Sequence, residues 1–431
     1  MRVRGWLGKG VNRWWIAAFG AAVLLLPPLF LASWALARSG SLDRGFGANG
    51  LVVEDLESGG PWPGAVVVQS GGRVVVGTGG QIVRFRRDGV RDSSFSARSL
   101  PLTDLVGLPG DRLIRLGDNE LERMLPDGAR DPGFARASGG TVSAPGIELG
   151  AIAVDPEERI VAVGHDANTG ALAVTRFLPG GQLDLGFGSG GVVRTAISAP
   201  GPTNLDIGRS VSVGVDGKIL VGGSAGSEED CTGAMHCWGP YLDAVVLRYL
   251  SDGTLDGSFA RGGIFEAKGG GWGSAESVVP LADGGLLFLP GPPTGALEAG
   301  YQFPLAVVAL TPQGERDSSF SRDGIGAWVP RVHGKRAAYK GATRMLVTPR
   351  GQIVACGWVA RSEYRPSKFW VGLLSADGRP VRSFGSNGSA WTPMPSKRDG
   401  YAASLALGPG GTVYLAGSLG PDLALARYHL N

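Results

Sequence analysis

The residues DGTLDGSFARGGIF (252–265), with VDGKILVGG (215–223) before them, determine the fold, because the chain repeats both patterns along most of its length. At the centre of the first pattern lies an Asp-x-x-Phe motif. Its copies are 39 to 72 residues apart: LDRGF (42–46), RDSSF (91–95), RDPGF (130–134), LDLGF (183–187), LDGSF (255–259), RDSSF (316–320) and VRSF (381–384). A chain that repeats one pattern in this way builds one supersecondary unit many times.

Each repeat unit contains four short strands. Two strands meet at a tight Asp-Gly or Gly-Gly turn, which is a hairpin signal because such turns need positive φ. A third strand ends at the motif, and a fourth follows it. In the unit quoted above these are strand A (210–215), strand B (218–222), strand C (244–250) and strand D (262–265).

Several of these strands are apolar at consecutive positions, as at 66–68 and 74–76, so both of their faces must be covered. Stacking four-stranded sheets radially covers both faces of every sheet, which is the arrangement of propeller blades. The sequence therefore predicts an all-β fold: a single β-propeller with seven four-stranded blades.

The units resemble the delta-60 repeat, a bacterial β-propeller repeat with the pattern D-G-x-L-D-x-S-F-G-x-G-G-x-V followed by a P-D-G-K-I-x-V-A-G hairpin. Residues 252–265 and 215–223 match it, and the resemblance covers residues 40–431. It implies the fold and no catalytic residues. The last copy departs from the pattern, since Val381 stands where the other six have aspartate.

The two ends of the propeller complete each other in the sequence. The chain ends in a C strand with no D strand after it, and residues 40–53 carry a motif and a D strand with no A, B or C strand before them. We expect residues 51–53 to pair beside 423–428, which would close the ring and leave no exposed edge.

The first 37 residues predict export. They contain four Lys or Arg residues and no acid, and residues 14–37 form an uncharged apolar stretch. The small residues around Ala35 and Ala37 favour cleavage after Ala37, whereas the length of the stretch also suits a retained anchor, in which residues 14–37 would span the membrane. Either outcome leaves the propeller outside the cytoplasm, secreted or on the cell surface.

Without this segment the chain is almost neutral, because 41 minus 4 leaves 37 Lys and Arg residues against 38 Asp and Glu. This balance argues against nucleic-acid binding, which needs a basic face.

The three cysteines have different predicted roles. Cys231 and Cys237 flank a short loop, and in an oxidising compartment such a pair forms a loop-closing disulfide. The alternative is a metal site that uses His236, although the spacing is unusual for zinc and a fourth ligand is missing. Cys356, within IVACGW, is expected to be a small buried apolar residue.

Long connections gather at one end of the predicted blades. The A–B turns and the motifs lie at the other end, because strands alternate in direction. The long connections are B–C segments 224–243, 290–303 and 359–368 and D–A segments 195–207 and 331–341. Binding residues concentrate on loops that a rigid scaffold holds, so we expect this long-loop face to bind a partner.

Six tryptophans in or beside these connections are candidate binding-face aromatics: Trp62, Trp238, Trp272, Trp328, Trp358 and Trp391. Exposed tryptophans suit a glycan or protein partner. The recurrence of Trp-Pro and Trp-x-Pro favours the other interpretation, in which the rings fill gaps between blades.

The aspartate of the motif invites a metal hypothesis that the chemistry does not support. A calcium loop needs several oxygen ligands within a short segment, and each unit offers one aspartate. We expect the aspartate to accept backbone N–H groups within its turn. The sequence predicts no metal site and no cofactor.

The expected function is non-catalytic binding of a protein or polysaccharide by a monomeric, extracytoplasmic propeller. No enzyme motif is present in a suitable context. The alternative is a lyase or hydrolase with residues gathered around the central channel, for which His165, Asp166, Arg331 and His333 are the first residues to test.

Overall fold

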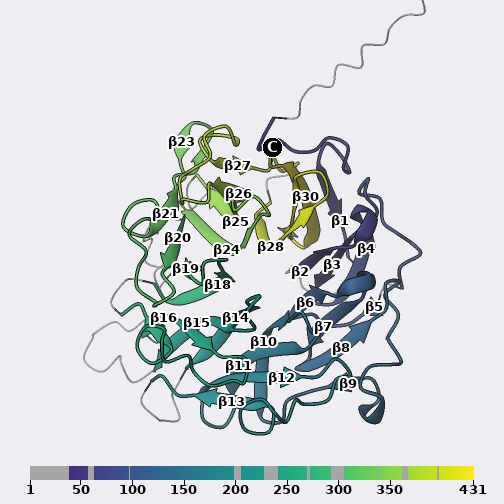
Figure 1. Cartoon of the computed structure of the whole chain (residues 1–431). Helices are drawn as coiled ribbons and strands as arrows, with labels where there is room; N and C mark the ends of the chain where they lie inside the picture. Colours follow the sequence, from purple (N-terminus) through teal and green to yellow (C-terminus); the bar gives the residue numbers. More distant parts are fainter. Residues whose placement is uncertain are drawn as a thin grey trace, which may run out of the picture. The chain divides into compact units, whose positions relative to one another are not determined.

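The computed structural model describes residues 38–56, 63–96, 98–198, 205–227, 241–268, 272–292, 305–337, 339–361, 367–395 and 398–431. In these residues the strands form seven four-stranded antiparallel sheets around a common centre, together with one short hairpin (Figure 1). The predicted seven-bladed β-propeller is confirmed. Residues 38–431 supply every strand of the seven blades.

The first four blades follow in chain order, each from strand A to strand D. Blade 1 contains β2 (Pro63–Val68), β3 (Val74–Thr78), β4 (Gln81–Phe85) and β5 (Arg98–Ser99). Blade 2 contains β6 (Asp104–Gly107), β7 (Leu113–Gly117), β8 (Glu120–Met124) and β9 (Thr141–Val142). Blade 3 contains β10 (Ile147–Val154), β11 (Ile160–Asp166), β12 (Leu172–Phe177) and β13 (Val192–Thr195). Blade 4 contains β14 (Ile207–Val213), β15 (Ile219–Ser227), β16 (Tyr241–Tyr249) and β17 (Ile264–Glu266).

The remaining blades include a hairpin and the ring closure. Blade 5 contains β18 (Ser274–Pro280), β19 (Leu286–Gly291), β20 (Leu305–Leu310) and β21 (Ile325–Trp328). The hairpin of β22 (Arg331–Val332) and β23 (Lys335–Arg336) follows. Blade 6 contains β24 (Tyr339–Val347), β25 (Ile353–Ala360), β26 (Lys368–Leu374) and β27 (Ser389–Trp391). Blade 7 contains β28 (Gly400–Gly408), β29 (Thr412–Leu419), β30 (Asp422–His429) and β1 (Leu51–Glu54).

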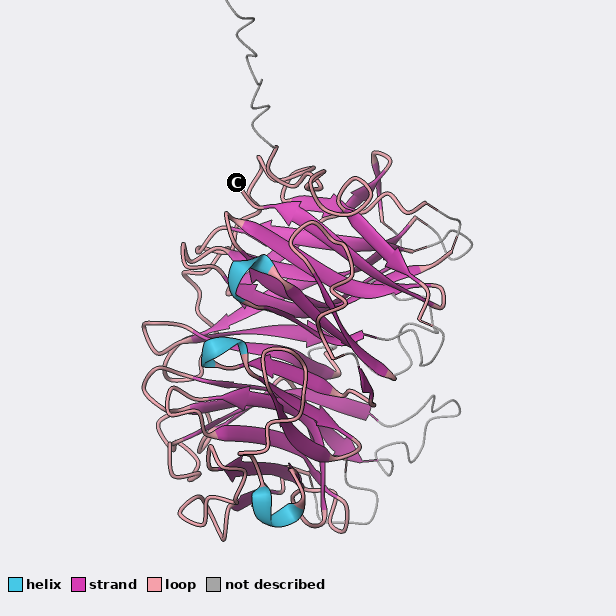
Figure 2. Ribbon diagram, turned by 90° about the vertical axis from the view of Figure 1, so that its right-hand side faces the viewer, coloured by secondary structure: helices cyan, strands magenta, loops and turns pink. Residues whose placement is uncertain are grey.

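Three short 3-10 turns mark the end of the blades opposite the long connections. They are η1 (Ser70–Gly72), η2 (Pro109–Asp111) and η3 (Arg136–Ser138), and Figure 2 shows them in cyan along one side of the molecule. Across the described ranges, no helix has the length and apolar character to cross a membrane.

The core is divided into seven clusters of buried apolar side chains, one between each pair of neighbouring blades. Each blade packs apolar side chains against the neighbouring blade on both of its faces, which explains the consecutive apolar positions in the sequence. The A strands contact the A strands of the adjacent blades and therefore lie nearest the axis.

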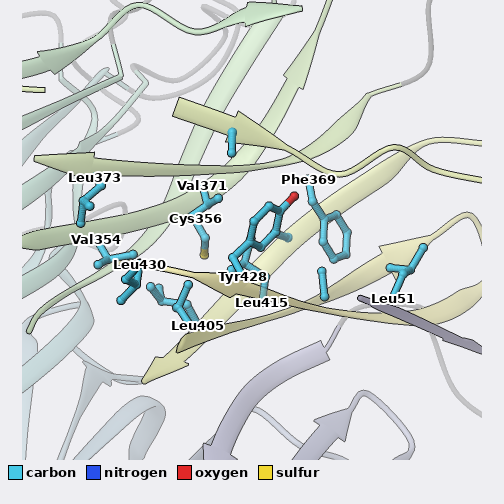
Figure 3. Packing of buried hydrophobic residues seen from close by; sticks show 14 of the residues in the cluster. Leu51, Val354, Cys356, Phe369, Val371, Leu373, Leu405, Leu415, Tyr428 and Leu430 are labelled. Atoms are coloured by element: carbon cyan, nitrogen blue, oxygen red, sulfur yellow. The ribbon is translucent and has the colours of Figure 1, made fainter. Parts of the chain in front are cut away.

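The ring closes as predicted. Strand β1 pairs antiparallel with β30, so that Leu51 lies opposite Ala426 and Val53 opposite Ala424. Figure 3 shows Leu51 in the same apolar cluster as Phe369 and Tyr428, between blades 6 and 7. One blade is thus built from both ends of the propeller chain, and no blade of the ring lacks its outer strand.

The aspartate of the motif has the predicted structural role. Its Oδ1 accepts the N–H of the residue two positions later at 2.7–3.1 Å in six copies: Asp43, Asp92, Asp131, Asp184, Asp256 and Asp317. The phenylalanine three residues later is at most 5% exposed in every copy and lies in the cluster that faces the next blade.

An arginine completes the unit in five blades and was not predicted; in blades 1 to 4 it stands eight residues before the aspartate. It forms an ion pair with the aspartate at 2.7–2.9 Å, its guanidinium lies 4.5–5.3 Å from the phenylalanine ring centroid, and it donates to a backbone carbonyl of the next blade. In blade 7 the arginine is Arg427, near the end of the chain, and its partner is Asp43 at the other end of the propeller sequence. The five arginines are Arg84, Arg123, Arg176, Arg248 and Arg427.

The residue after each phenylalanine also joins two blades. Its N–H donates to a carbonyl in the turn of the next blade in all seven copies, for example Ala135 to Gly180 and Gly385 to Ser39. The motif therefore links the blades in a complete circle.

Blades 5 and 6 show what replaces the ion pair. In blade 6 both positions are apolar, with Leu373 in place of arginine and Val381 in place of aspartate, and the two side chains pack in one cluster. In blade 5, Ala309 replaces the arginine, and among the described residues the Asp317 side chain bonds only to Ser319 in its own turn. The link between blades is thus retained without the charges.

Two groups of sequence predictions concern other parts of the chain. Cys356 is fully buried, as predicted, and burial raises the pKa of its thiol to about 12. The following lie outside the described residues and stay predictions: the export segment at 1–37, Trp62, Trp238, and the Cys231–Cys237 disulfide with its His236 alternative.

Candidate binding site at the mouth of the channel

The A strands of six blades carry a β-bulge. The A–B register slips by one residue in six blades, at Gly64, Gly150, Arg209, Glu276, Thr343 and Ala403. A bulge changes the direction of a side chain, and bulges often lie beside functional sites. The bulged residues are small in blades 1, 3 and 7, and they are polar in blades 4, 5 and 6.

Four of the bulged residues line one cavity of about 350 Å³. This volume lies at the lower end of the usual range for ligand pockets, about 300–1,000 Å³. The cavity is lined by Arg209, Glu276, Thr343, Arg344, Trp358, Tyr401, Ala402 and Ala403. These residues come from the first halves of β14, β18 and β28, the middle of β24 and the last half of β25, so the cavity lies toward the long-loop end of the channel.

Two arginines give the cavity its charge. Arg209 and Arg344 form no ion pair with any other residue that the structure describes, although Arg209 Nε lies 3.5 Å from Ser224 Oγ. Glu276, the acid of the cavity, accepts a hydrogen bond from Ser274 Oγ. The lining therefore carries two cations and one anion, and both guanidiniums retain capacity to bind an anionic group.

Across the channel, the charge of Arg344 lowers the pKa of a buried carboxyl group. Asp104, in blade 2, accepts the N–H groups of Leu105 and Ile152 at 2.9 and 3.0 Å. Burial raises the pKa of Asp104, and the positive charge of Arg344 partly offsets this rise. Asp104 therefore belongs to the same electrostatic environment as the cavity.

The aromatic wall of the cavity consists of Trp358 and Tyr401. Their ring centroids are 5.6 Å apart in an edge-to-face arrangement. Gly341 allows the tryptophan to pack against the backbone of β24, since a Cβ at this position would lie 2.6 Å from Trp358 Nε1. Both rings are half-buried and offer an apolar surface beside the charged groups.

The other predicted tryptophans that the structure describes do not line the cavity. Trp328 is 1% exposed and packs edge-to-face against Trp370, with ring centroids 5.2 Å apart. Its assignment as a binding-face aromatic is wrong, and it fills the space between blades 5 and 6. Trp272 packs against Phe288, and Trp391 is half-buried beside His333.

The four residues suggested for an enzyme do not line the cavity. Asp166 accepts a hydrogen bond from Arg194 and the N–H groups of Asn168 and Thr169, and chiefly the Arg194 bond lowers its pKa to about 2. His165 lies 3.5 Å from Glu148 in blade 3. His333 and Arg331 lie in the β22–β23 hairpin, where Arg331 donates to the Gly334 carbonyl. Within the described ranges, no cluster of three or more potential metal ligands forms.

Sequence reasoning missed Arg209, Glu276, Arg344 and Tyr401. Aligning the units on their A–B turns would have provided one signal, because Arg209 and Glu276 stand where blades 1, 3 and 7 have glycine or alanine.

These features define a closed seven-bladed β-propeller with a polar, aromatic cavity at one end of its channel. No protein-family model and no curated protein matches the chain. Virginiamycin B lyase from Staphylococcus aureus has a similar structure, with a TM-score of 0.50 and 12% identity over 87% of this chain and 98% of that one. The WD40 domain of Pan2 from Neurospora crassa has a TM-score of 0.50 and 11% identity over 86% and 89%. At these identities the likeness shows the fold alone.

Proposed function

We propose that this protein is an extracytoplasmic, non-catalytic propeller that binds an anionic group of a polysaccharide or protein in the cavity at the long-loop end of its channel. The observation that carries the proposal is the pair Arg209 and Arg344, which lack an ion-pair partner among the described residues and lie in one cavity with Trp358 and Tyr401. The predicted export segment supports the location.

The residue types in the cavity favour recognition. Guanidiniums bind carboxylates through paired hydrogen bonds, and aromatic rings pack against the apolar face of a sugar or side chain. Of the remaining three blades, blades 1 and 3 have glycine at the bulge, at Gly64 and Gly150, so the ligand would contact blades 4 to 7.

The alternative function is that of an extracytoplasmic lyase or hydrolase. One observation favours it: Glu276 lies in the cavity with both arginines, where a carboxylate of this kind is suited to accept a proton. Such an enzyme would consume its ligand and would lose turnover in Glu276→Gln.

The test uses residues 38–431 and isothermal titration with short oligogalacturonates, acidic peptides and neutral malto-oligosaccharides. We expect an acidic probe to bind and Arg209→Gln and Arg344→Gln each to weaken binding about tenfold, the effect of losing a charged hydrogen bond. Arg322→Gln is the matched control, because this side chain is 93% exposed and lies at the other end of the blades.

Two results would contradict the proposal. Equal affinity of the parent and of the Arg209→Gln, Arg344→Gln double variant would exclude the cavity as the binding site. Breakdown of the probe, followed by product absorbance and abolished by Glu276→Gln, would establish the enzyme instead.

A further inference from the structure

The charge of blade 6 differs from that of the rest of the propeller. Among the described residues between Asp323 and Asp377, every Lys, Arg, Asp or Glu is basic. These residues are Arg331, Lys335, Arg336, Lys340, Arg344, Arg350, Arg361 and Lys368. The chain from residue 38 on has 37 basic and 38 acidic residues in total, so the part outside this segment carries a net negative charge. Positive charge is therefore concentrated at one place.

Most of these cations lie at the long-loop end of blade 6, and Arg350 lies in the A–B turn at the other end. Lys340 stands near the start of β24, Arg361 just after β25, and Lys368 at the start of β26. Because β24 is the inner strand and β27 the outer one, these positions form a row from the channel to the rim. We call this row, with Arg344 and the β22–β23 hairpin, the basic track.

The hairpin adds exposed cations beside blade 6 (Figure 1). Val332 and Ala337 are buried and anchor it, whereas Arg331, Lys335 and Arg336 are exposed. The hairpin contacts β27, since the ring of His333 lies 4.9 Å from that of Trp391. A short ribbon held in this way presents three cations on a fixed support.

The charges of the track are not neutralised within the described structure. None of Arg331, Lys335, Arg336, Lys340, Arg344, Arg361 and Lys368 forms an ion pair with a described residue. The pKa of Lys340 is lowered by burial and by the nearby charge of Arg336. Gathering like charges costs stability, and a bound polyanion would offset that cost.

Aromatic rings accompany the cations along the track. At its outer end Lys368 Nζ lies 5.2 Å from the ring centroid of Trp391. At its inner end Trp358 and Tyr401 form the wall of the cavity. The track thus alternates positive groups with apolar rings from β27 to the channel.

We propose that the basic track binds an acidic polysaccharide, which lies across blade 6 and places one end in the channel cavity. The inference rests on the proposed function and extends it from one anionic group to a polymer that carries a carboxylate at regular intervals. Sugar rings have apolar faces that pack on Trp391 and Trp358, and their carboxylates would contact the intervening cations. An anionic membrane surface suits the track less well, because Arg344 is half-buried inside the channel.

The test compares a polymer with a short ligand. Residues 38–431 carrying Lys335→Gln, Arg336→Gln and Lys340→Gln should bind polygalacturonate about tenfold more weakly than the parent, since each surface charge pair contributes roughly 0.5 kcal/mol. Binding of a galacturonate disaccharide in the cavity should stay unchanged. The matched control is Arg44→Gln, Arg86→Gln and Arg322→Gln, which removes the same charge from exposed positions at the motif end.

Each outcome is decisive. Equal polymer affinity in the parent and the track variant would overturn the track while leaving the cavity intact. Loss of disaccharide binding in Arg344→Gln, with disaccharide binding retained in the variant of Lys335, Arg336 and Lys340, would show that the cavity binds the disaccharide without the outer part of the track. Binding to anionic phospholipid vesicles that polygalacturonate cannot displace would assign the track to a membrane and overturn the proposal.

Discussion

The two ends of the propeller use arginine in opposite ways. At the motif end, Arg123 is largely buried, pairs with Asp131 at 2.7 Å and donates to the carbonyl of Pro179 in the next blade. At the long-loop end, Arg344 lines a cavity and has no ion-pair partner among the described residues. The first arginine recurs in five blades and holds the ring together, whereas the second occurs once. In this protein, repetition marks structure, and departures from the repeat mark the candidate site.

The largest effect should follow from opening the ring at the motif end. Deleting residues 40–55 removes β1 and the buried Phe46 and Leu51. Losing one buried phenylalanine costs about 3–5 kcal/mol, and the deletion also exposes the edge of β30, so the loss approaches the whole stability of a typical protein. We expect unfolding or oligomerisation in thermal melts and size-exclusion chromatography.

The control for this deletion is the chain that begins at Arg38. An equal melting temperature and a monomeric elution for both chains would show that β1 does not close the ring, and would contradict the pairing of Leu51 with Ala426.

The sequence predicted the aspartate turns at this end of the molecule because their contacts are local. Asp131 bonds to Gly133 within its own turn, so the letters of the motif record the geometry directly. The channel site escaped prediction because Arg209 and Arg344 become neighbours only when the ring assembles, 135 positions apart in the chain. Trp328 shows a further limit: its Trp-x-Pro pattern favoured a ring that fills a gap between blades, as observed, but did not identify Trp370 as the ring it packs against.

A smaller effect should follow from breaking one ion pair of the motif. Arg123→Leu leaves Asp131 partly buried without its cation and should destabilise the protein by about 3 kcal/mol. Adding Asp131→Val reproduces the Leu373 and Val381 pair of blade 6, and we expect the double variant to return to within about 1 kcal/mol of the parent. Urea unfolding measures all three proteins.

The same variants should change the response to acid. Burial tends to raise the pKa of Asp131, but the hydrogen bonds from the N–H of Gly133 and from Arg123, and the charge of Arg123, lower it by more. The net shift of the pKa is therefore downward. A lowered folded-state pKa stabilises the protein above the unfolded value of about 3.9 and ceases to do so as the pH falls through the folded value. The double variant should therefore lose less stability than the parent between about pH 5 and pH 2. Parallel pH profiles would show that the pair does not contribute.

The smallest effect on stability should come from the channel. Arg344→Gln breaks no ion pair with a described residue, and its main consequence is to remove the positive charge that offsets the raised pKa of Asp104. We expect a change of less than about 1 kcal/mol in unfolding free energy, typical of a substitution outside the packed core. Arg123→Leu and Arg344→Gln thus form a pair in which one variant loses stability and the other loses binding. If Arg344→Gln destabilised the protein as much as Arg123→Leu, the channel arginine would be a structural residue, and the distinction between the two ends would fail.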